Sequence, residues 1–164
     1  MLNIQSYGKV TKKIVMEQKK IFVDINNARG REDLTAKLQR SLDTEEDPFA
    51  PTNIQSFNRK PILKTKEYWF VTEAENKYPG AENHFLIISN EYWETVFDIT
   101  PAASSELIEI MKELSREFKI TGGGYFSRVG DTTITGATVK RMHVHFFKPK
   151  PGAGVITIPL GRKS

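Results

Sequence analysis

Residues 138–149 read TVKRMHVHFFKP and form the most informative stretch of the chain. Successive side chains of an extended strand point to opposite faces. Arg141, His143 and His145 would therefore share one face of this strand. The opposite face would carry the apolar side chains Met142, Val144 and Phe146. The alternation predicts a strand with one chemical face and one face packed into a core.

The chain has only 3 histidines, and two of them stand here two residues apart. Two neighbouring imidazoles can divide a reaction between a nucleophile and a proton donor. The same pair also fits a solvated strand face or half of a metal site. A transition metal usually takes three or four ligands, and the chain offers no cysteine and only His84 besides the pair. We therefore predict neither a metal nor another cofactor.

Length and composition indicate one hydrophobic core with an extension, because 164 residues with 38% hydrophobic content fill one domain of ordinary size. The absence of cysteine excludes a disulfide scaffold and fits a reducing compartment. No apolar run approaches the roughly 20 residues that cross a bilayer. Residues 1–7 are polar and lack the apolar region of a signal peptide. We expect a soluble, cytoplasmic protein.

The net charge of +4 is modest, and much of the excess lies in residues 9–20 and 161–164. Nucleic-acid-binding surfaces usually carry a denser basic stripe with aromatic residues between the charges. A solvated surface explains these charges equally well, so nucleic acid is not an expected partner. Recruitment of RNA or a protein by the basic N-terminal segment stays an alternative.

The first sixty residues give weaker patterns. Residues 13–26 fit two short strands or one helix, and their β-branched content favours extended structure. Residues 31–42 predict a short helix, with leucines at positions 34, 38 and 42. Residues 43–61 contain three prolines and predict a connector that wraps over the domain.

The pattern changes to strands and one long helix after Pro61. Thr100 and Pro101 form a helix start, and an apolar stripe then continues to Phe118, which predicts a helix over residues 101–119. Apolar and β-branched runs predict the other strands. Besides the histidine strand, they are expected at residues 62–65, 68–72, 85–88, 125–129 and 155–160.

This order of elements resembles the histidine triad superfamily, whose motif is His-φ-His-φ-His-φ-φ with φ hydrophobic. The resemblance covers about residues 60–149, and the best local match is residues 136–147. It implies that His143 is the nucleophile and that His145 assists departure of the leaving group. Arg141 stands where the family has its first histidine.

An arginine cannot replace an imidazole as an acceptor, because its guanidinium is always protonated. Two uses of Arg141 are open at this stage. It can bind a phosphate bidentately, or it can pair with a carboxylate on a neighbouring strand.

The resemblance assigns four further positions. It implies that Glu73 binds the ribose hydroxyls, that His84 belongs to the nucleotide site, and that Thr138 and the N–H groups around Gly136 contact the phosphate. A solvated carboxylate, a hydrogen-bonded histidine at a strand start and ordinary strand composition are the structural alternatives for Glu73, His84 and Thr138. The family's Pro-Lys-x-His sequence is replaced by Ser-Asn-Glu-Tyr at residues 89–92.

The elements and the resemblance together imply an α+β fold, an antiparallel sheet of about five strands with one long packed helix. Residues 1–59 would form an N-terminal extension and connector, and residues 60–164 the domain. The expected function is nucleotide hydrolysis or nucleotidyl transfer at an α-phosphate, through a covalent nucleotidyl-histidine. Candidate substrates are dinucleoside polyphosphates and nucleoside phosphoramidates. The alternative is a nucleotide-binding module that has lost turnover through Arg141. A homodimer is expected, and the place of the extension stays open.

Overall fold

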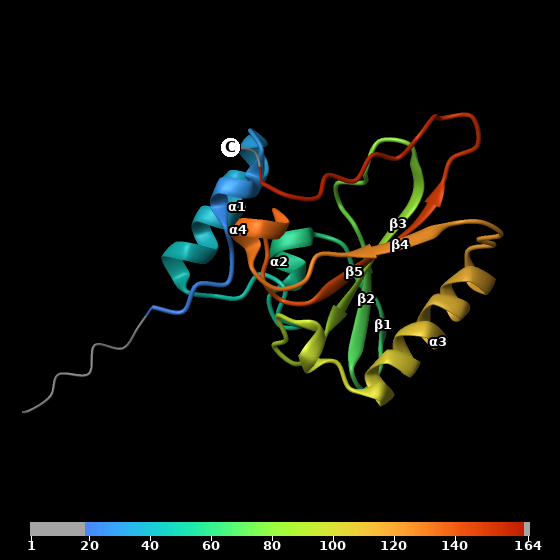
Figure 1. The fold of residues 1–164 in the computed structure, drawn as a ribbon, viewed down its shortest axis with the longest axis horizontal. Helices are drawn as coiled ribbons and strands as arrows, with labels where there is room; N and C mark the ends of the chain where they lie inside the picture. The colour runs from blue at the N-terminus through green and yellow to red at the C-terminus, as the bar shows by residue number, and fades with distance from the viewer. Residues whose placement is uncertain (1–18, 163–164) are drawn as a thin grey trace, which may run out of the picture.

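A five-stranded antiparallel sheet forms the centre of the protein, for which a computed structural model describes residues 19–162. The strand order is β1-β2-β3-β5-β4 (Figure 1). The strands are β1 (Ile62–Thr65), β2 (Trp69–Glu73), β3 (Ala81–Ser89), β4 (Gly124–Ser127) and β5 (His143–Pro149). Together with the helices below, this confirms the predicted α+β fold with about five strands.

Strand β5 lies between β3 and β4. Its register against β3 pairs His145 with Leu86 and His143 with Ile88, and it pairs His84 with Phe147. Side chains on directly opposed residues share a face of the sheet, while neighbours along a strand alternate. The histidines of β3 and β5 are therefore brought to the same region of the sheet.

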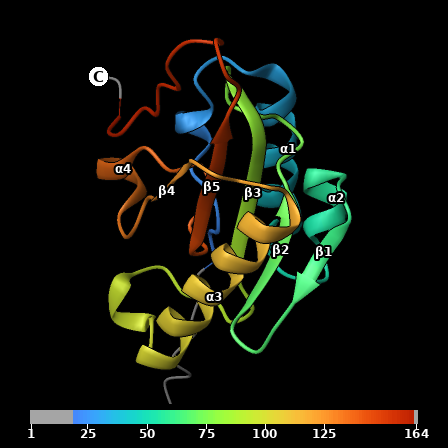
Figure 2. The ribbon, with the colours of Figure 1, turned by 90° about the vertical axis from the view of Figure 1, so that its right-hand side faces the viewer.

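Helix α3 (Pro101–Glu117) covers one face of the sheet (Figure 2). The Thr100 side chain caps it by accepting a hydrogen bond from the Ala103 N–H at 3.1 Å, as the sequence predicted. The apolar stripe of the helix packs on alternate side chains of the strands. The main members of this core are Trp69, Val71, Phe85, Ile87, Ile110, Leu114, Met142, Val144 and Phe146.

The N-terminal segment covers the opposite face of the sheet (Figure 2). Its elements are the 3-10 turn η1 (Ile25–Ala28), α1 (Glu32–Thr44) and the short helix α2 (Ile54–Asn58). A second core joins these elements to the sheet through Val23, Leu38, Phe49, Ile54, Phe70, Leu86, Ile88 and Val139. Because both faces of β2 and β3 are covered, these strands carry continuous apolar runs rather than a simple alternation.

The described part of the extension is thus a packed layer of the protein. The helix predicted at residues 31–42 is confirmed as α1. Val23 forms an isolated antiparallel bridge with Val139, which supports extended structure at that point, whereas residues 13–18 of the predicted strands lie outside the described residues.

Three details differ from the prediction. Two strands start elsewhere than predicted: β3 begins at Ala81 rather than at residue 85, and β5 begins at His143 rather than at the start of the stretch 138–149. The loop predicted at residues 130–137 contains a single helical turn, α4 (Thr132–Thr135). The strand predicted at residues 155–160 is wrong, because no strand forms there and the segment crosses the histidine face instead. Pro159 lacks the N–H that a ladder needs.

Two remaining findings complete the fold. A 3-10 turn, η2 (Val96–Asp98), precedes α3. Within residues 19–162, none of the helices is both long and apolar enough to cross a membrane.

Candidate functional site

Three histidines meet on the face of the sheet that the extension covers. The ring centroids of His143 and His145 lie 5.0 Å apart, and those of His84 and His145 lie 5.1 Å apart. All three side chains are at least 92% shielded from solvent, since their exposed fractions are 2%, 6% and 8% for His84, His143 and His145. The strand register thus gathers every histidine of the chain into one cluster.

The His143 ring is fixed by its own strand. Its Nδ1 lies 2.8 Å from the carbonyl oxygen of Arg141. A carbonyl oxygen only accepts, so Nδ1 must carry the proton and the neutral ring keeps its lone pair on Nε2. This Nε2 is not sealed inside the protein, in contrast to the buried side-chain nitrogens that have no hydrogen-bond partner. The lone pair of His143 is therefore available to a molecule in the adjoining pocket.

His145 and His84 form a second unit. The Nε2 of His84 lies 2.8 Å from the Nδ1 of His145, so one ring donates and the other accepts. The remaining nitrogens, His145 Nε2 and His84 Nδ1, are buried without a protein partner in the described chain. Tyr78 stacks near this pair, with its ring 5.3 Å from His84. A buried nitrogen without a partner is costly, which suits a position that meets a ligand.

The environment keeps all three rings neutral at physiological pH. The pKa of His143 is lowered to about 4, mainly because burial outweighs the opposing effect of the Arg141 carbonyl, and the charge of Arg128 acts in the same direction as burial. Burial and the neighbouring His143 lower the pKa of His84 to about 4. The pKa of His145 lies well below its ordinary value, because of burial and the proximity of both other histidines. His143 is consequently a neutral imidazole over a wide pH range.

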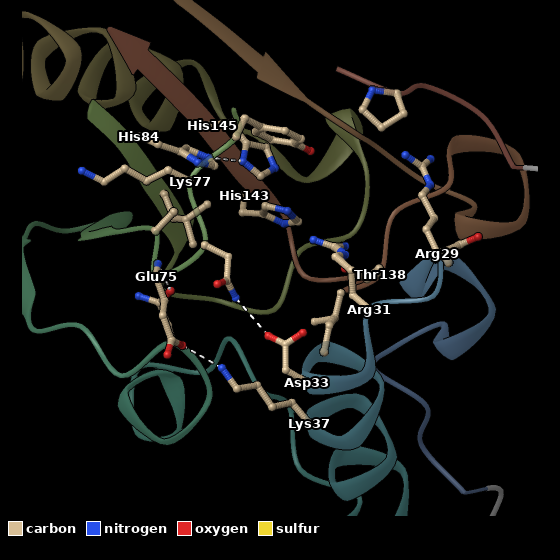
Figure 3. Close-up of a pocket in the computed structure, with 18 of the residues that line it drawn as sticks. Arg29, Arg31, Asp33, Lys37, Glu75, Lys77, His84, Thr138, His143 and His145 are labelled. Atoms are coloured by element: carbon tan, nitrogen blue, oxygen red, sulfur yellow. Dashed lines mark hydrogen bonds and ion pairs between the residues drawn. The ribbon is translucent and has the colours of Figure 1, made fainter. Parts of the chain in front are cut away.

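A pocket of about 620 Å³ opens over the histidines (Figure 3). The extension supplies one wall and the sheet supplies another, while the segment around Thr157 and Pro159 closes part of the rim. The positively charged side chains that line it are Arg29, Arg31, Lys37, Lys77 and Arg128. Their number indicates an anionic ligand.

The structure places some of the predicted site residues in the pocket and others outside it. His84, Gly136, Thr138, His143 and His145 all line the pocket.

Glu73 is not among the lining residues, and its carboxylate pairs with Lys77 at 2.8 Å. The amide of Gly136 donates to the Thr132 carbonyl at 3.0 Å, because it closes the turn of α4. That N–H is therefore already occupied, contrary to the expectation that it stabilises phosphate charge.

Arg141 is turned away from the pocket. Its Nε donates to the Asp47 carboxylate at 2.6 Å, and its Nη1 donates to the carbonyls of Ser89 and Asn90 at 2.8 and 3.0 Å. Both charged side chains are buried, with exposed fractions of 6% for each residue. Of the two uses considered for Arg141, pairing with a carboxylate is the one observed. The carboxylate comes from the connector and not from a neighbouring strand, and these bonds occupy the Nε and Nη1 donors of the guanidinium.

Removal of Asp47 should be strongly destabilising. Asp47→Ala would leave the Arg141 charge buried without its partner, which typically costs about 3–5 kcal/mol of unfolding free energy. Chemical denaturation followed by fluorescence measures this loss. The matched control is Glu82→Ala, which breaks the exposed Lys148–Glu82 pair (2.8 Å) and should cost about 1 kcal/mol or less. Equal losses in the two variants would contradict a structural role for the Asp47–Arg141 pair.

The basic wall of the extension was not predicted from the sequence. Arg29 and Arg31 flank Gly30 in a turn, and nothing in the local pattern distinguishes them from solvated residues. Arg128 lies within the strand predicted at residues 125–129 and directly follows the observed β4, so its position beside the histidines depends on the pairing of β4 with β5. The available signal was the position of these arginines near turns, and this signal is too weak to define a site.

Comparison with known proteins agrees with this geometry. The family model described as "HIT domain" matches residues 60–152, which is more than half of the chain. The chain belongs to the HIT domain family. Arg29 and Arg31 lie outside the matched HIT domain, whereas His84, Arg128, His143 and His145 lie inside it.

Solved structures similar to this HIT chain include two of proteins from Clostridium species. A histidine triad protein from Clostridium difficile shares 18% identity at a TM-score of 0.47, over 58% of this chain and 84% of that one. A HIT family hydrolase from Clostridium thermocellum shares 24% identity at a TM-score of 0.45, over 60% and 86% of the two chains. No curated protein matches the chain at a significant level.

Among the residues from 19 to 162, no cluster of three or more histidine, cysteine, aspartate or glutamate side chains is arranged to hold a metal ion.

Proposed function

We propose that this HIT protein is a nucleotide hydrolase or nucleotidyl transferase that acts at the α-phosphate of a nucleotide conjugate. The observation that supports this most directly is the fixed orientation of His143. Its Nδ1 proton is held by the Arg141 carbonyl, and its Nε2 lone pair is available to the pocket. Such an imidazole can attack phosphorus without first losing a proton.

The proposed reaction has two steps. In the first, the His143 Nε2 forms a bond to the α-phosphorus while the bond from phosphorus to the bridging atom of the leaving group breaks. The leaving group departs with its electron pair and accepts a proton from His145. In the second, water or another acceptor attacks the phosphorus and releases the nucleotide from His143.

His84 supports this assignment by setting the tautomer of His145. If the His84 Nε2 donates to the His145 Nδ1 across their 2.8 Å contact, the proton of neutral His145 lies on Nε2. The Nε2 is the buried atom without a protein partner, and it is the one that would face the leaving group. A bound phosphate adds negative charge beside this ring and favours its protonated form, which is the form that gives a proton to the leaving group. In that form the His145 Nδ1 becomes the donor and the His84 Nε2 the acceptor across the same contact.

Arg128 would stabilise the charge that develops on the phosphate. Its positive charge lowers the pKa of both His143 and His145, so its guanidinium lies within electrostatic reach of both rings. A fixed cation at this place needs no reorganisation during the reaction. Thr138, which also lines the pocket, would offer a hydroxyl to a phosphate oxygen.

The covalent intermediate can be tested by intact mass spectrometry. The protein is incubated briefly with adenylyl and guanylyl conjugates and quenched under non-acidic conditions, which preserve phosphohistidine. We expect a nucleoside monophosphate adduct in the wild type and none in His143→Asn. The released product is assayed in the same samples, so rapid resolution of the adduct is still detected.

The alternative, a nucleotide-binding module without turnover, predicts a different result. Wild type and His143→Asn would then bind nucleotide equally, and neither adduct nor product would form. The partner of the site is a nucleotide in both cases. A homodimer stays a prediction from the family resemblance, and sedimentation velocity of the full chain tests it.

A further inference from the structure

Three arginines line one end of the pocket without a carboxylate partner. Arg29 donates from Nη2 to the Gly161 carbonyl at 2.9 Å, and Arg31 donates from Nε to the Ala28 carbonyl at 3.2 Å. Arg128 donates to the Pro159 carbonyl and, at 3.4 Å, to the Tyr78 hydroxyl. All these acceptors are neutral. Within the described chain, none of the three guanidiniums forms an ion pair.

The other two cations of the pocket are neutralised. Lys37 pairs with Glu75 at 2.7 Å, and Lys77 pairs with Glu73 at 2.8 Å. Figure 3 shows Glu75 and Lys77 on the side of the pocket opposite Arg29. The cations that form no ion pair within the described residues therefore lie at one end, where the C-terminal segment closes the rim. The lining also holds the carboxylate of Asp33, which accepts a hydrogen bond from Asn76 at 3.3 Å, so three arginines face one acidic side chain that is not paired with any of them.

The arginines are also close enough to repel one another. Burial lowers the pKa of Arg29, and the charges of Arg128 and Arg31 lower it further. Like charges held together in a half-buried site are destabilising until an anion binds between them. A planar guanidinium has several donors in a fixed fork that fits phosphate oxygens, so arginines suit this use better than lysines.

The opposite end of the pocket has another character. Phe57 lies there beside Lys37, and the lining of the pocket also includes the apolar side chains of Leu34, Ala74 and Leu86. Lys37 lies over the Phe57 ring, 5.7 Å from the centroid, beside its ion-pair partner Glu75. A surface that is mostly apolar, and whose few charged groups are neutralised by ion pairs, is typical of a site for a flat organic group such as a nucleoside. The pocket is thus polarised, with the histidines between the two ends.

We propose that Arg29, Arg31 and Arg128 form a second anion subsite, which holds a phosphate of the leaving group while the nucleoside occupies the apolar end. This inference rests on the proposed function and specifies its substrate class. The bond that breaks joins the α-phosphorus to the bridging oxygen, and that oxygen leaves as part of the phosphate held by the arginines. Conjugates whose leaving group carries phosphate, such as dinucleoside polyphosphates, are then preferred over phosphoramidates, whose leaving group is an amine.

The subsite is tested with the double variant Arg29→Gln/Arg31→Gln. Diadenosine triphosphate and adenosine 5′-phosphoramidate serve as matched substrates. Each lost charge-assisted contact should reduce kcat/KM about tenfold, so we expect a loss of about 100-fold with diadenosine triphosphate. The phosphoramidate should change less than about threefold. The control is Arg40→Gln, because Arg40 is exposed on helix α1, which begins directly after Arg31, and it does not line this pocket.

Binding of inorganic pyrophosphate, measured by calorimetry, separates the subsite from the chemistry. We expect the wild type to bind pyrophosphate and the double variant to bind it at least tenfold more weakly, with Arg40→Gln unchanged. If the wild type turns over neither conjugate and this binding difference persists, the proposed function fails and the subsite stands. Equal losses on both substrates, or equal pyrophosphate affinity in wild type and double variant, would overturn the subsite. So would a wild type that binds no pyrophosphate.

A folding control accompanies both measurements. The thermal unfolding midpoint of the double variant should stay close to that of Arg40→Gln. If it falls markedly, Arg31→Gln alone is used, since within residues 19–162 the Arg31 side chain bonds only to the nearby Ala28 carbonyl, and a tenfold loss is then expected. An unchanged kcat/KM in a folded Arg31→Gln counts against the subsite.

Discussion

His143→Gln is expected to lower kcat by about 10⁴-fold or more with every substrate that the wild type accepts. A nucleophile that forms the covalent intermediate cannot be bypassed within the same mechanism, and losses of this size are typical when one is removed. Glutamine keeps a side-chain amide able to bond the Arg141 carbonyl, so the fold and nucleotide binding should persist. Steady-state kinetics and nucleotide binding measured on the same preparation check both parts.

His145→Gln should behave differently, because a proton donor matters only when the leaving group needs a proton. With a basic leaving group we expect a loss of about 10²- to 10⁴-fold. With a weakly basic one, such as a nitrophenolate ester of the nucleotide, the loss should be much smaller. Equal losses in His145→Gln for both leaving groups would contradict the division of roles between the two histidines.

Acid should destabilise the protein well above the pH at which carboxylates titrate. The pKa of His84 and of His143 is about 4 in the folded state, against about 6.5 in an unfolded chain. Between these values the unfolded state binds more protons, so stability rises with pH in this window. The stability is complete above pH 6.5 and is lost as the pH falls towards 4. At about 1.4 kcal/mol per pKa unit, each of these two histidines contributes about 2 kcal/mol of loss by pH 5.

Urea denaturation at a series of pH values from 7.5 to 5 measures this dependence. All 3 histidines of the chain lie in this cluster, so histidine-linked acid sensitivity must come from the site. His84→Gln removes one titrating ring and should reduce the slope of unfolding free energy against pH. A slope that is flat in the wild type, or identical in the two proteins, would show that the rings are not held neutral by the fold.

Local patterns in the sequence were sufficient for the elements that carry the chemistry. Alternation around His143 and His145 predicted a strand with two distinct faces, and Thr100 with Pro101 predicted the start of α3. Both features depend on residues close together in the chain, where periodicity and capping act directly. The resemblance to histidine triad proteins rested on the same local pattern.

Other features depend on contacts between distant segments, which no local pattern encodes. Asp47 lies 94 residues from Arg141, so the identity of its partner was open until the connector was placed on the sheet. Residues 155–160 have strand-forming composition, but they join no strand of the sheet, and Thr157 and Pro159 line the pocket instead. Arg29 and Arg31 acquire their meaning only from the pocket that they share with Arg128.

Because residues 19–59 pack on the histidine face, the residues of the site come from two different segments of the chain. The proposed nucleophile and proton donor lie on β5, while Arg29 and Arg31 belong to the extension. Changes in the extension can therefore alter which leaving groups are accepted while the reacting strand stays the same. The reacting strand depends more strictly on the extension, because Asp47 of the extension anchors Arg141 and the Arg141 carbonyl orients His143. A graft of another relative's extension onto this sheet would transfer selectivity only if it also brought an acid to the place of Asp47.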